Sequence, residues 1–339
     1  MKLSILDQAP ILAGSTPREA LVHSLRLAQA GERLGYTRFW MAEHHDLGGL
    51  ACSAPEIMLG YIGANTSTIR LGAGAILLPY YRPYKVAETF NLLATLFPGR
   101  IDLGIARSPG GSAEVSMALA DRYLDNVWKL PEAFEELLRF LDGTHPEDHP
   151  YSKIAAAPLP PVPPEPWVLG TSKKSAMLAA EQGTAYAYGL FMNEENAKEA
   201  VEAYFANFRP NRTLKKPYLV LAVSALCADT AERALELSLS SFATGWQASR
   251  GTPIEGGLPA PEDARKYLEG LGEDEIRSRM MARSAIGTPA EVRRRLEQWR
   301  DEYRADELML LSYAHDFGDR LGSYERIARE MALTPRTLS

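Results

Sequence analysis

The stretch W-M-A-E-H-H-D, Trp40 to Asp46, sets two adjacent imidazoles beside a carboxylate at the end of a short apolar run. These histidines are metal ligands, a proton-transferring pair, or solvated loop residues. A metal site needs a third converging ligand, and Asp7, Asp102 and His315 are the candidates, but their spacing matches no recognised metal motif. Histidine titrates near neutral pH and a neighbouring glutamate can hold its tautomer, so proton transfer is favoured over metal binding.

A second stretch, V-L-G-T-S-K-K-S from Val168 to Ser175, runs from an apolar segment straight into a predicted helix. Thr171 or Ser172 can act simply as the helix N-cap. Alternatively, the turn at Gly170, the hydroxyls and the positive end of the helix dipole form a phosphate site. Arg107 and Arg122 are the arginines that would complete its charge, although each is equally typical of a protein surface.

A third stretch, L-G-A-G-A-I-L-L-P from Leu71 to Pro79, carries small residues in a predicted strand. Such residues either allow close packing in the core or let the backbone approach a flat ligand. The sequence alone does not separate these two interpretations.

The elements that would position these residues follow a repeating pattern. Short apolar runs alternate with longer segments that have helical spacing, which is typical of repeated βα units. Strands are predicted at 2–6, 38–42, 70–77, 101–105, 167–170, 185–188, 218–225 and 307–311. Helices are predicted at 17–34, 54–65, 83–97, 172–182, 194–208, 230–242, 289–303 and 319–331. This pattern predicts an α/β fold, a (β/α)₈ TIM barrel whose active face lies at the carboxyl ends of its strands.

Two irregular insertions interrupt the repeat within a single predicted domain, residues 1–339. Residues 143–166 are rich in proline, which excludes a helix or a central strand there. Residues 244–284 combine glycine, proline and charge around a short helical piece. An insertion of this kind is typical of a lid or binding loop.

Composition limits the partners. The 339 residues carry a net charge of −6 and no long basic block, so nucleic acid is not an expected partner. The N-terminus lacks the apolar region of a signal peptide, and no segment has the apolar length of a membrane span, so we expect a cytoplasmic protein. Two cysteines, Cys52 and Cys227, are too few for a disulfide framework and are expected to be reduced.

Taken in order, these stretches resemble the bacterial luciferase-like family of flavin-dependent monooxygenases. The resemblance covers nearly the whole chain. It rests on L-S-I-L-D-Q at 3–8, A-E-H-H at 42–45, G-A-G-A at 72–75, P-G-R-I-D-L-G-I-A-R at 98–107, L-G-T-S at 169–172, I-G-T-P at 286–289 and A-D-E-L-M-L at 305–310.

The resemblance implies a barrel that holds FMN at its C-terminal face. It implies that His44 is catalytic and that a non-prolyl cis peptide at Gly74-Ala75 lies against the flavin ring. The implied cofactor-binding residues are Glu43, Gly74, Ala75, Arg107, Arg122, Gly170, Thr171, Ser172 and Ser175, with no metal ligand. Ala106 stands where light-emitting members carry a reactive cysteine, so light emission is not expected.

The implied activity is monooxygenation of a small organic substrate by reduced FMN and O₂. No glycine-rich dinucleotide fingerprint follows a strand, so a separate flavin reductase would supply the reduced FMN. Three rival interpretations stay open: a deazaflavin-dependent hydride-transfer oxidoreductase, a metal-dependent hydrolase built on Glu43, His44 and His45, and a non-catalytic flavin-binding protein.

Family members commonly form dimers through the helices at 54–65 and 83–97. Both helices carry more apolar residues than one buried stripe requires, namely Leu59, Tyr61, Ile62, Phe90, Leu93 and Phe97. A homodimer is therefore expected.

Overall fold

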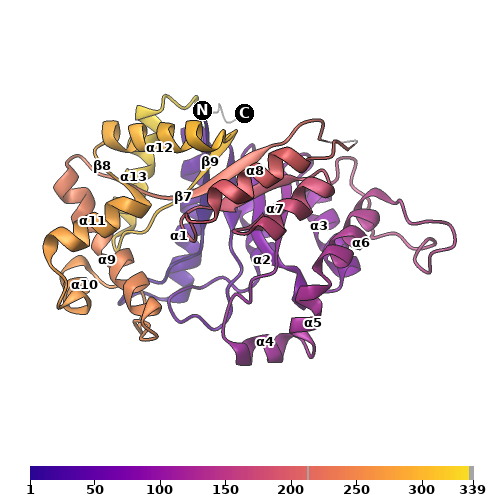
Figure 1. Ribbon diagram of the computed structural model, residues 1–339, viewed down its shortest axis with the longest axis horizontal. Coiled ribbons are helices and arrows are strands. Elements are labelled where there is room, and N and C mark those ends of the chain that lie inside the picture. The colour runs from indigo at the N-terminus through magenta and orange to yellow at the C-terminus, as the bar shows by residue number, and fades with distance from the viewer. Residues whose placement is uncertain (212–213, 336–339) are drawn as a thin grey trace.

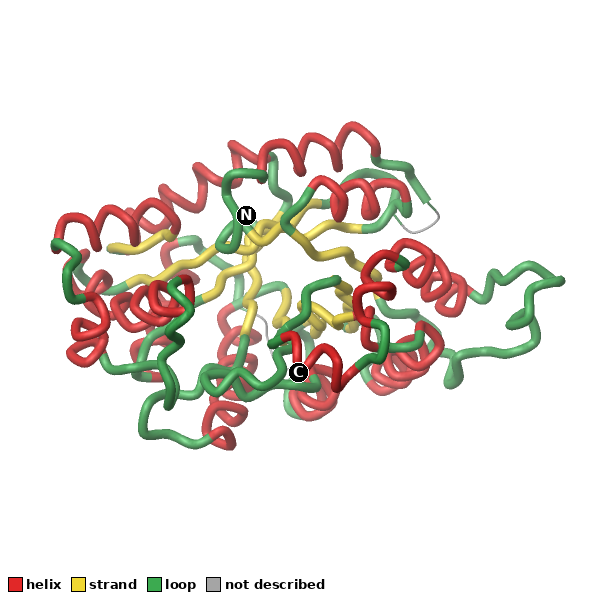
Figure 2. The backbone as a smooth tube through the Cα atoms, turned by 60° about the horizontal axis from the view of Figure 1, so that its bottom comes forward, coloured by secondary structure: helices red, strands yellow, loops and turns green. Residues whose placement is uncertain are grey.

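Eight parallel strands close into a barrel in the computed structural model, which describes residues 1–211 and 214–335. The strands are β1 (Lys2–Asp7), β2 (Arg38–Met41), β3 (Arg70–Leu77), β4 (Ile101–Ala106), β5 (Glu165–Gly170), β6 (Ala185–Gly189), β7 (Leu219–Cys227) and β9 (Glu307–Leu311). They pair in the order β1-β2-β3-β4-β5-β6-β7-β9, and β9 pairs back to β1. Figure 2 shows the strands in the centre with helices around them. The predicted (β/α)₈ barrel is confirmed.

The helices that surround the barrel are labelled in Figure 1. They are α1 (Pro17–Leu34), α2 (Pro55–Gly63), α3 (Pro83–Leu96), α4 (Ala113–Leu119), α5 (Tyr123–Trp128), α6 (Leu130–Asp142), α7 (Lys173–Glu181), α8 (Ala197–Asn207), α9 (Ala231–Ser249), α10 (Pro261–Ala264), α11 (Glu273–Arg283), α12 (Pro289–Tyr303) and α13 (Phe317–Glu330). Two short 3₁₀ turns, Leu78–Tyr80 and Arg265–Leu268, follow β3 and α10. Among the described residues, no helix has the length and apolar character that a membrane span needs.

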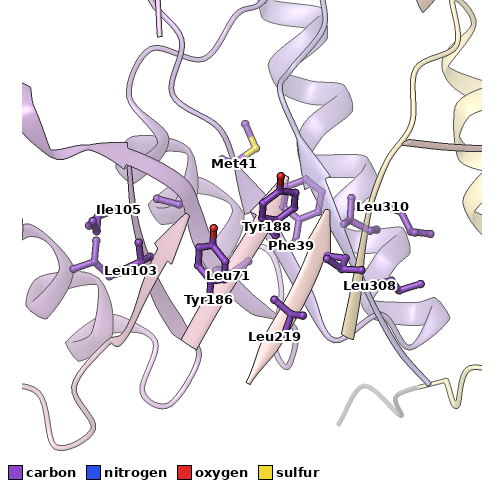
Figure 3. Close-up of a cluster of buried hydrophobic side chains, with 14 of the residues drawn as sticks. Phe39, Met41, Leu71, Leu103, Ile105, Tyr186, Tyr188, Leu219, Leu308 and Leu310 are labelled. Atoms are coloured by element: carbon purple, nitrogen blue, oxygen red, sulfur yellow. The ribbon is translucent and has the colours of Figure 1, made fainter. Parts of the chain in front are cut away.

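Side chains alternate along each strand between the inside and the outside of the barrel, as the pleat requires. Phe39 and Met41 of β2 and Leu308 and Leu310 of β9 point outward into the layer beneath the helices, which Figure 3 shows in part. The intervening residues fill the barrel interior: Leu6, Trp40, Ala42, Trp167, Ala185, Ala187, Val220, Ala222 and Met309.

The amino-terminal end of the barrel is closed by a buried ion network. The Arg38 guanidinium lies 2.9 Å from the Asp102 carboxylate and 3.2 Å from that of Glu307, and it stacks 4.6 Å from the Trp167 ring centre. Arg70 pairs with Asp102 as well. Buried charges are tolerated only when they are paired and hydrogen-bonded, and here they are. The network therefore seals the barrel interior at this end.

Three parts of the fold differ from the prediction. The helices α4, α5 and α6 after β4 were not predicted; α4 and α5 are short and bury almost no apolar side chain, so they leave little periodicity in the sequence. Strand β8 (Ser284–Gly287) was also missed, because it directly follows the irregular region 244–284 and is additional to the eightfold repeat. It pairs only with the end of β7 and lies outside the closed barrel.

The region 244–284 is more regular than the sequence indicated. Helix α9 continues to Ser249, and α10 and α11 pack beside it around a separate apolar cluster that includes Leu237, Leu268 and Met280. Charged residues cover most of α11, which hides its helical periodicity. The proline-rich region 143–166 is an extended excursion as predicted, except that β5 already begins at Glu165.

Candidate functional site

A cavity of about 570 Å³ lies at the carboxyl ends of the barrel strands. This volume is in the usual range of small-molecule and cofactor sites. Nine of the ten predicted site residues line it: Glu43, His44, Gly74, Ala75, Arg107, Gly170, Thr171, Ser172 and Ser175. Residues that are far apart in the chain therefore converge on one site, as the barrel topology requires.

Arg122 is the predicted site residue that the structure does not bring to the cavity. Its side chain is three-quarters exposed, and its Nε donates a hydrogen bond of 2.7 Å to the Asp125 carboxylate. It stands just before α5, while Tyr123, the next residue, does line the cavity.

The carboxylate of Glu43 ties three segments together at the cavity wall. It accepts hydrogen bonds from the Leu77 backbone N–H at 2.9 Å and from the Tyr81 hydroxyl at 2.7 Å, and it lies 2.8 Å from His45 Nε2. Burial raises the pKa of Glu43, and its partners oppose that shift. The loop after β2 is thereby fixed to the end of β3. The hydrogen bonds of Glu43 stabilise the cavity wall. A direct contact between Glu43 and a cofactor stays a prediction.

His44 projects from that fixed loop in a half-buried position. Its backbone N–H donates to the Cys52 carbonyl at 3.0 Å, whereas its Nδ1 is buried without a partner among the described residues. Burial and the neighbouring His45 lower the pKa of His44 to about 4. The imidazole is therefore neutral near pH 7, where it can accept a proton at one ring nitrogen and donate a hydrogen bond from the other.

A cluster of donors forms one end of the cavity, where β4 and β5 end. Arg107 Nη2 donates to Ser172 Oγ at 3.1 Å, and Ser172 is the N-cap of α7. Ser175 Oγ lies 3.0 Å from the hydroxyl of Tyr186, a buried residue that anchors the turn from below. A positive side chain, several hydroxyls and the start of a helix therefore face one place, and this donor set fits a phosphate group.

Close packing within that cluster explains why residue 170 is a glycine. A Cβ at this position would lie 2.4 Å from Ser175 Oγ, so only glycine lets the turn and the helix approach so closely. The N-cap and the phosphate interpretations of this stretch are compatible, because Ser172 caps the helix and also faces the cavity.

The small residues of β3 have two distinct roles. A Cβ on Gly72 would meet the Trp40 indole at 2.4 Å, so that glycine makes room for a side chain that fills the barrel. Gly74 and Ala75 line the cavity, the peptide bond between them is cis, and the β3–β4 register shifts between Ala73 and Ile76. The close-packing interpretation therefore applies to Gly72, whereas Gly74 and Ala75 lie at the cavity wall and the ligand-approach interpretation of them stays a prediction.

The remaining wall was not predicted. It comes from the barrel interior, from α5 and from the loop after β6, and it includes Leu6, Gln8, Trp40, Tyr123, Leu124, Val127, Phe191, Met192, Ala222 and Met309. Alternation along β1, β2, β7 and β9 would have placed Leu6, Trp40, Ala222 and Met309 inside the barrel once a barrel was assumed. Nothing comparable marks the residues of α5.

The expected lid lies beside the cavity and does not line it. Leu258 forms a bridge with Leu12 in the loop after β1, and its backbone bonds with Ile11 and Ala13. No described residue between 244 and 284 is among those that line the cavity.

The geometry does not support the metal-hydrolase interpretation. Asp7 pairs with Arg320 at 2.8 Å, Asp102 lies in the ion network at the other end of the barrel, and His315 Nδ1 lies 2.9 Å from the Leu258 carbonyl. Among residues 1–211 and 214–335, no three His, Cys, Asp or Glu side chains cluster as metal ligands.

The lowered pKa of His44 makes a prediction about stability. A histidine with an unfolded pKa near 6.5 and a folded pKa of about 4 stabilises the fold fully above pH 6.5, and this contribution is lost as the pH falls toward 4. At pH 4.5 the loss should be about 2–3 kcal/mol. Urea unfolding of His44→Gln should therefore show a shallower decline between pH 7 and 4.5 than the unmodified protein, by about that amount. Parallel declines would mean that His44 titrates normally.

Comparison with known proteins bears on this geometry. Residues 1–305 match the family described as luciferase-like monooxygenase. The chain is 41% identical over 326 residues to the uncharacterised protein YceB of Bacillus subtilis, covering 96% of this chain and 98% of that one. It is 34% identical to the N-acetyl-S-alkylcysteine monooxygenase of the same organism, covering 97% of each chain.

Solved structures of other proteins share this fold. The apo form of MsnO8 superposes with a TM-score of 0.89 at 37% identity, covering 99% of each chain. Two more distant proteins share the fold, namely the oxygenating constituent of 3,6-diketocamphane monooxygenase of Pseudomonas putida with FMN (TM-score 0.72, 18% identity, 98% of each chain) and an F420-dependent secondary alcohol dehydrogenase (TM-score 0.68, 14% identity, 97% of this chain and 98% of that one). Because the family model matches residues 1–305 and the relatives named above cover nearly the whole chain, this chain belongs to the luciferase-like monooxygenase family.

Proposed function

We propose that this family member is an FMN-dependent monooxygenase. The observation that carries the proposal is the pairing, within one cavity, of a phosphate-sized donor cluster at Arg107 and Ser172 with a neutral imidazole at His44. Reduced FMN, when bound, supplies the two electrons with which one atom of O₂ enters the substrate and the other leaves as water. A separate flavin reductase would provide the reduced FMN.

The chain's own residues would bind the FMN, orient its ring and shield the reacting atoms from water. Arg107, Thr171, Ser172 and Ser175 would hold the phosphate, and the backbone at Gly74-Ala75 would lie against the ring. His44, neutral at working pH, would accept or donate a proton near the reacting atoms. The cavity is closed from below by Trp40, which keeps water away from that side.

Phosphate binding gives the first test. Charge-assisted hydrogen bonds contribute roughly 1.5–3 kcal/mol each, so Arg107→Ala should weaken FMN binding about tenfold to a hundredfold. Titration should also show that riboflavin, which lacks the phosphate, binds much more weakly than FMN. Arg139→Ala, which removes an exposed arginine paired with Glu135 on α6, is the matched control and should bind FMN normally. Arg122→Ala reports whether that exposed arginine turns toward the ligand.

Equal dissociation constants for FMN and riboflavin would remove the phosphate assignment. Tight binding of a deazaflavin cofactor, with substrate turnover in the absence of O₂, would replace the monooxygenase by a hydride-transfer enzyme. Tight FMN binding without any O₂-dependent product from any substrate would leave a flavin-binding protein.

Proton transfer gives the second test. His44→Ala should bind FMN within a few-fold of the unmodified protein, because the phosphate site is on other strands. Its rate of product formation should fall roughly a hundredfold to ten-thousandfold, the usual contribution of a general acid or base. Single-turnover oxidation of reduced FMN, with product and released hydrogen peroxide both measured, checks this. His149→Ala, in the loop before β5, is the control; undiminished product from His44→Ala would end the catalytic assignment.

We further propose a homodimer through α2 and α3, in which Tyr61 is the one residue named from the sequence that stays exposed. Leu59, Ile62, Phe90 and Leu93 are buried within the protomer, and Phe97 packs against its core. The apolar side chains that remain exposed are Ile57 and Tyr61 on α2 and Leu92 and Leu96 on α3, at 46–71% of their full area. Each pair is spaced one helical turn apart and forms an unpartnered stripe.

Replacing the stripe tests the dimer. The unmodified protein should show a dimer mass by light scattering at micromolar concentration, and the double variant Ile57→Asp/Leu96→Asp should show a monomer. Met117→Asp changes an equally exposed apolar side chain on α4 and should stay dimeric. A monomer mass for the unmodified protein contradicts the proposal.

A further inference from the structure

The end of the cavity opposite the phosphate cluster has a different chemical character. Around the closed barrel, β1 and β9 lie diametrically across from β5 and β4, which carry Arg107 and Ser172. The far end is lined by Leu6 and Gln8 from β1 and its loop, Met309 from β9, Ala222 from β7, and Phe191, whose backbone N–H donates to the Ala222 carbonyl at 3.2 Å.

No free charge from the part of the chain that the structure describes faces this far end. Among residues 1–211 and 214–335, the ionisable side chains that line the cavity are those of Glu43, His44, Arg107 and Tyr123, and burial raises the pKa of Tyr123 to about 12, so its phenol is neutral. Glu43 is occupied by its three partners, His44 is neutral, and Arg107 belongs to the opposite end.

Charges just outside the far wall are also neutralised. Asp7, which precedes Gln8, pairs with Arg320 at 2.8 Å, and both side chains are buried. The Gln8 side chain is hydrogen-bonded to the Tyr313 hydroxyl. An ion placed at this end would lose its water and find no opposite charge, which is costly in an apolar site.

We propose that the far end is the substrate site and that it takes an uncharged molecule with an apolar body, held against Leu6, Ala222, Met309 and Phe191. A single neutral polar group of that molecule would face Gln8 and His44. This inference rests on the proposed function, since the phosphate end is then reserved for FMN. It separates this chain's substrates from N-acetylated cysteine thioethers with a free carboxylate, the class named for the relative that is 34% identical.

Matched probes of equal chain length test the charge preference. Octanamide, octanoate and octylamine present the same apolar area with a neutral, a negative and a positive head group. Each is titrated at pH 8 into the FMN-loaded protein, with flavin fluorescence and calorimetry as readouts. Octanamide should bind at least about a hundredfold more tightly than octanoate and octylamine, because an unpaired buried charge is strongly disfavoured. Equal or tighter binding of either ion, or no binding of octanamide, would overturn the proposal.

Two variants at one position sharpen the test. Phe191 is only partly buried, so Phe191→Arg should fold, which circular dichroism verifies, and it should shift the preference toward octanoate by placing a cation at the far end. Phe191→Leu keeps the site neutral and should retain the preference for octanamide. Unchanged preference in a folded Phe191→Arg variant would show that the probes bind elsewhere.

A failure of the predicted charge preference can be distinguished from a failure of the proposed FMN-dependent function. Preference for FMN over riboflavin is measured in the same protein and tests the phosphate end alone. If FMN discrimination holds and the charge preference fails, the substrate assignment is wrong and the flavin assignment survives. If FMN does not bind, the same probes applied to the unloaded protein still report the character of the far end.

Discussion

The packing of Trp40 inside the barrel is the constraint on which the site depends. Its indole N–H donates to the Asp102 carboxylate at 2.9 Å, and its ring meets Trp167 edge to face, with ring centres 5.1 Å apart. Asp102 is in turn held by Arg38. The indole can occupy this place only because Gly72 has no side chain. Side chains therefore fill the barrel interior at the amino-terminal ends of the strands. The cavity lies at the carboxyl ends, and Trp40 forms its base.

The walls above that floor are fixed by two polar hubs on opposite sides. Glu43 joins the loop after β2 to the end of β3, and Ser175 with Tyr186 joins the start of α7 to β5 and β6. Both hubs are buried, so their hydrogen bonds are shielded from water and hold their geometry well. The histidine and the cluster of Arg107 and hydroxyl groups project from these hubs at separate points of the same cavity.

Much of this arrangement could be predicted from the sequence. The alternation of apolar runs with helical segments predicted the barrel, and α1 spans the residues 17–34 that its apolar spacing predicted. Nine residues named from the motif order line one cavity, and their roles toward a cofactor stay predictions. The sequence could not show that the Arg122 guanidinium pairs with Asp125. An arginine that binds a ligand and an arginine that forms a surface salt bridge look the same in a single sequence. Helices α4 and α5 were missed for a related reason, because they bury almost nothing and so have no apolar periodicity.

The pairing of β9 with β1 has a consequence for how the molecule folds. Ile5 lies beside Leu310, so the last pairing that closes the barrel joins residues separated by almost the whole chain. Contacts of such separation carry a large entropic cost before they stabilise anything, which makes closure a late and slow event. During synthesis β1 and β7 would leave the ribosome with edges that only β9 can cover. The nascent barrel is thus an open sheet until residue 311 has been added, and this interval is when the chain is most exposed to misassociation.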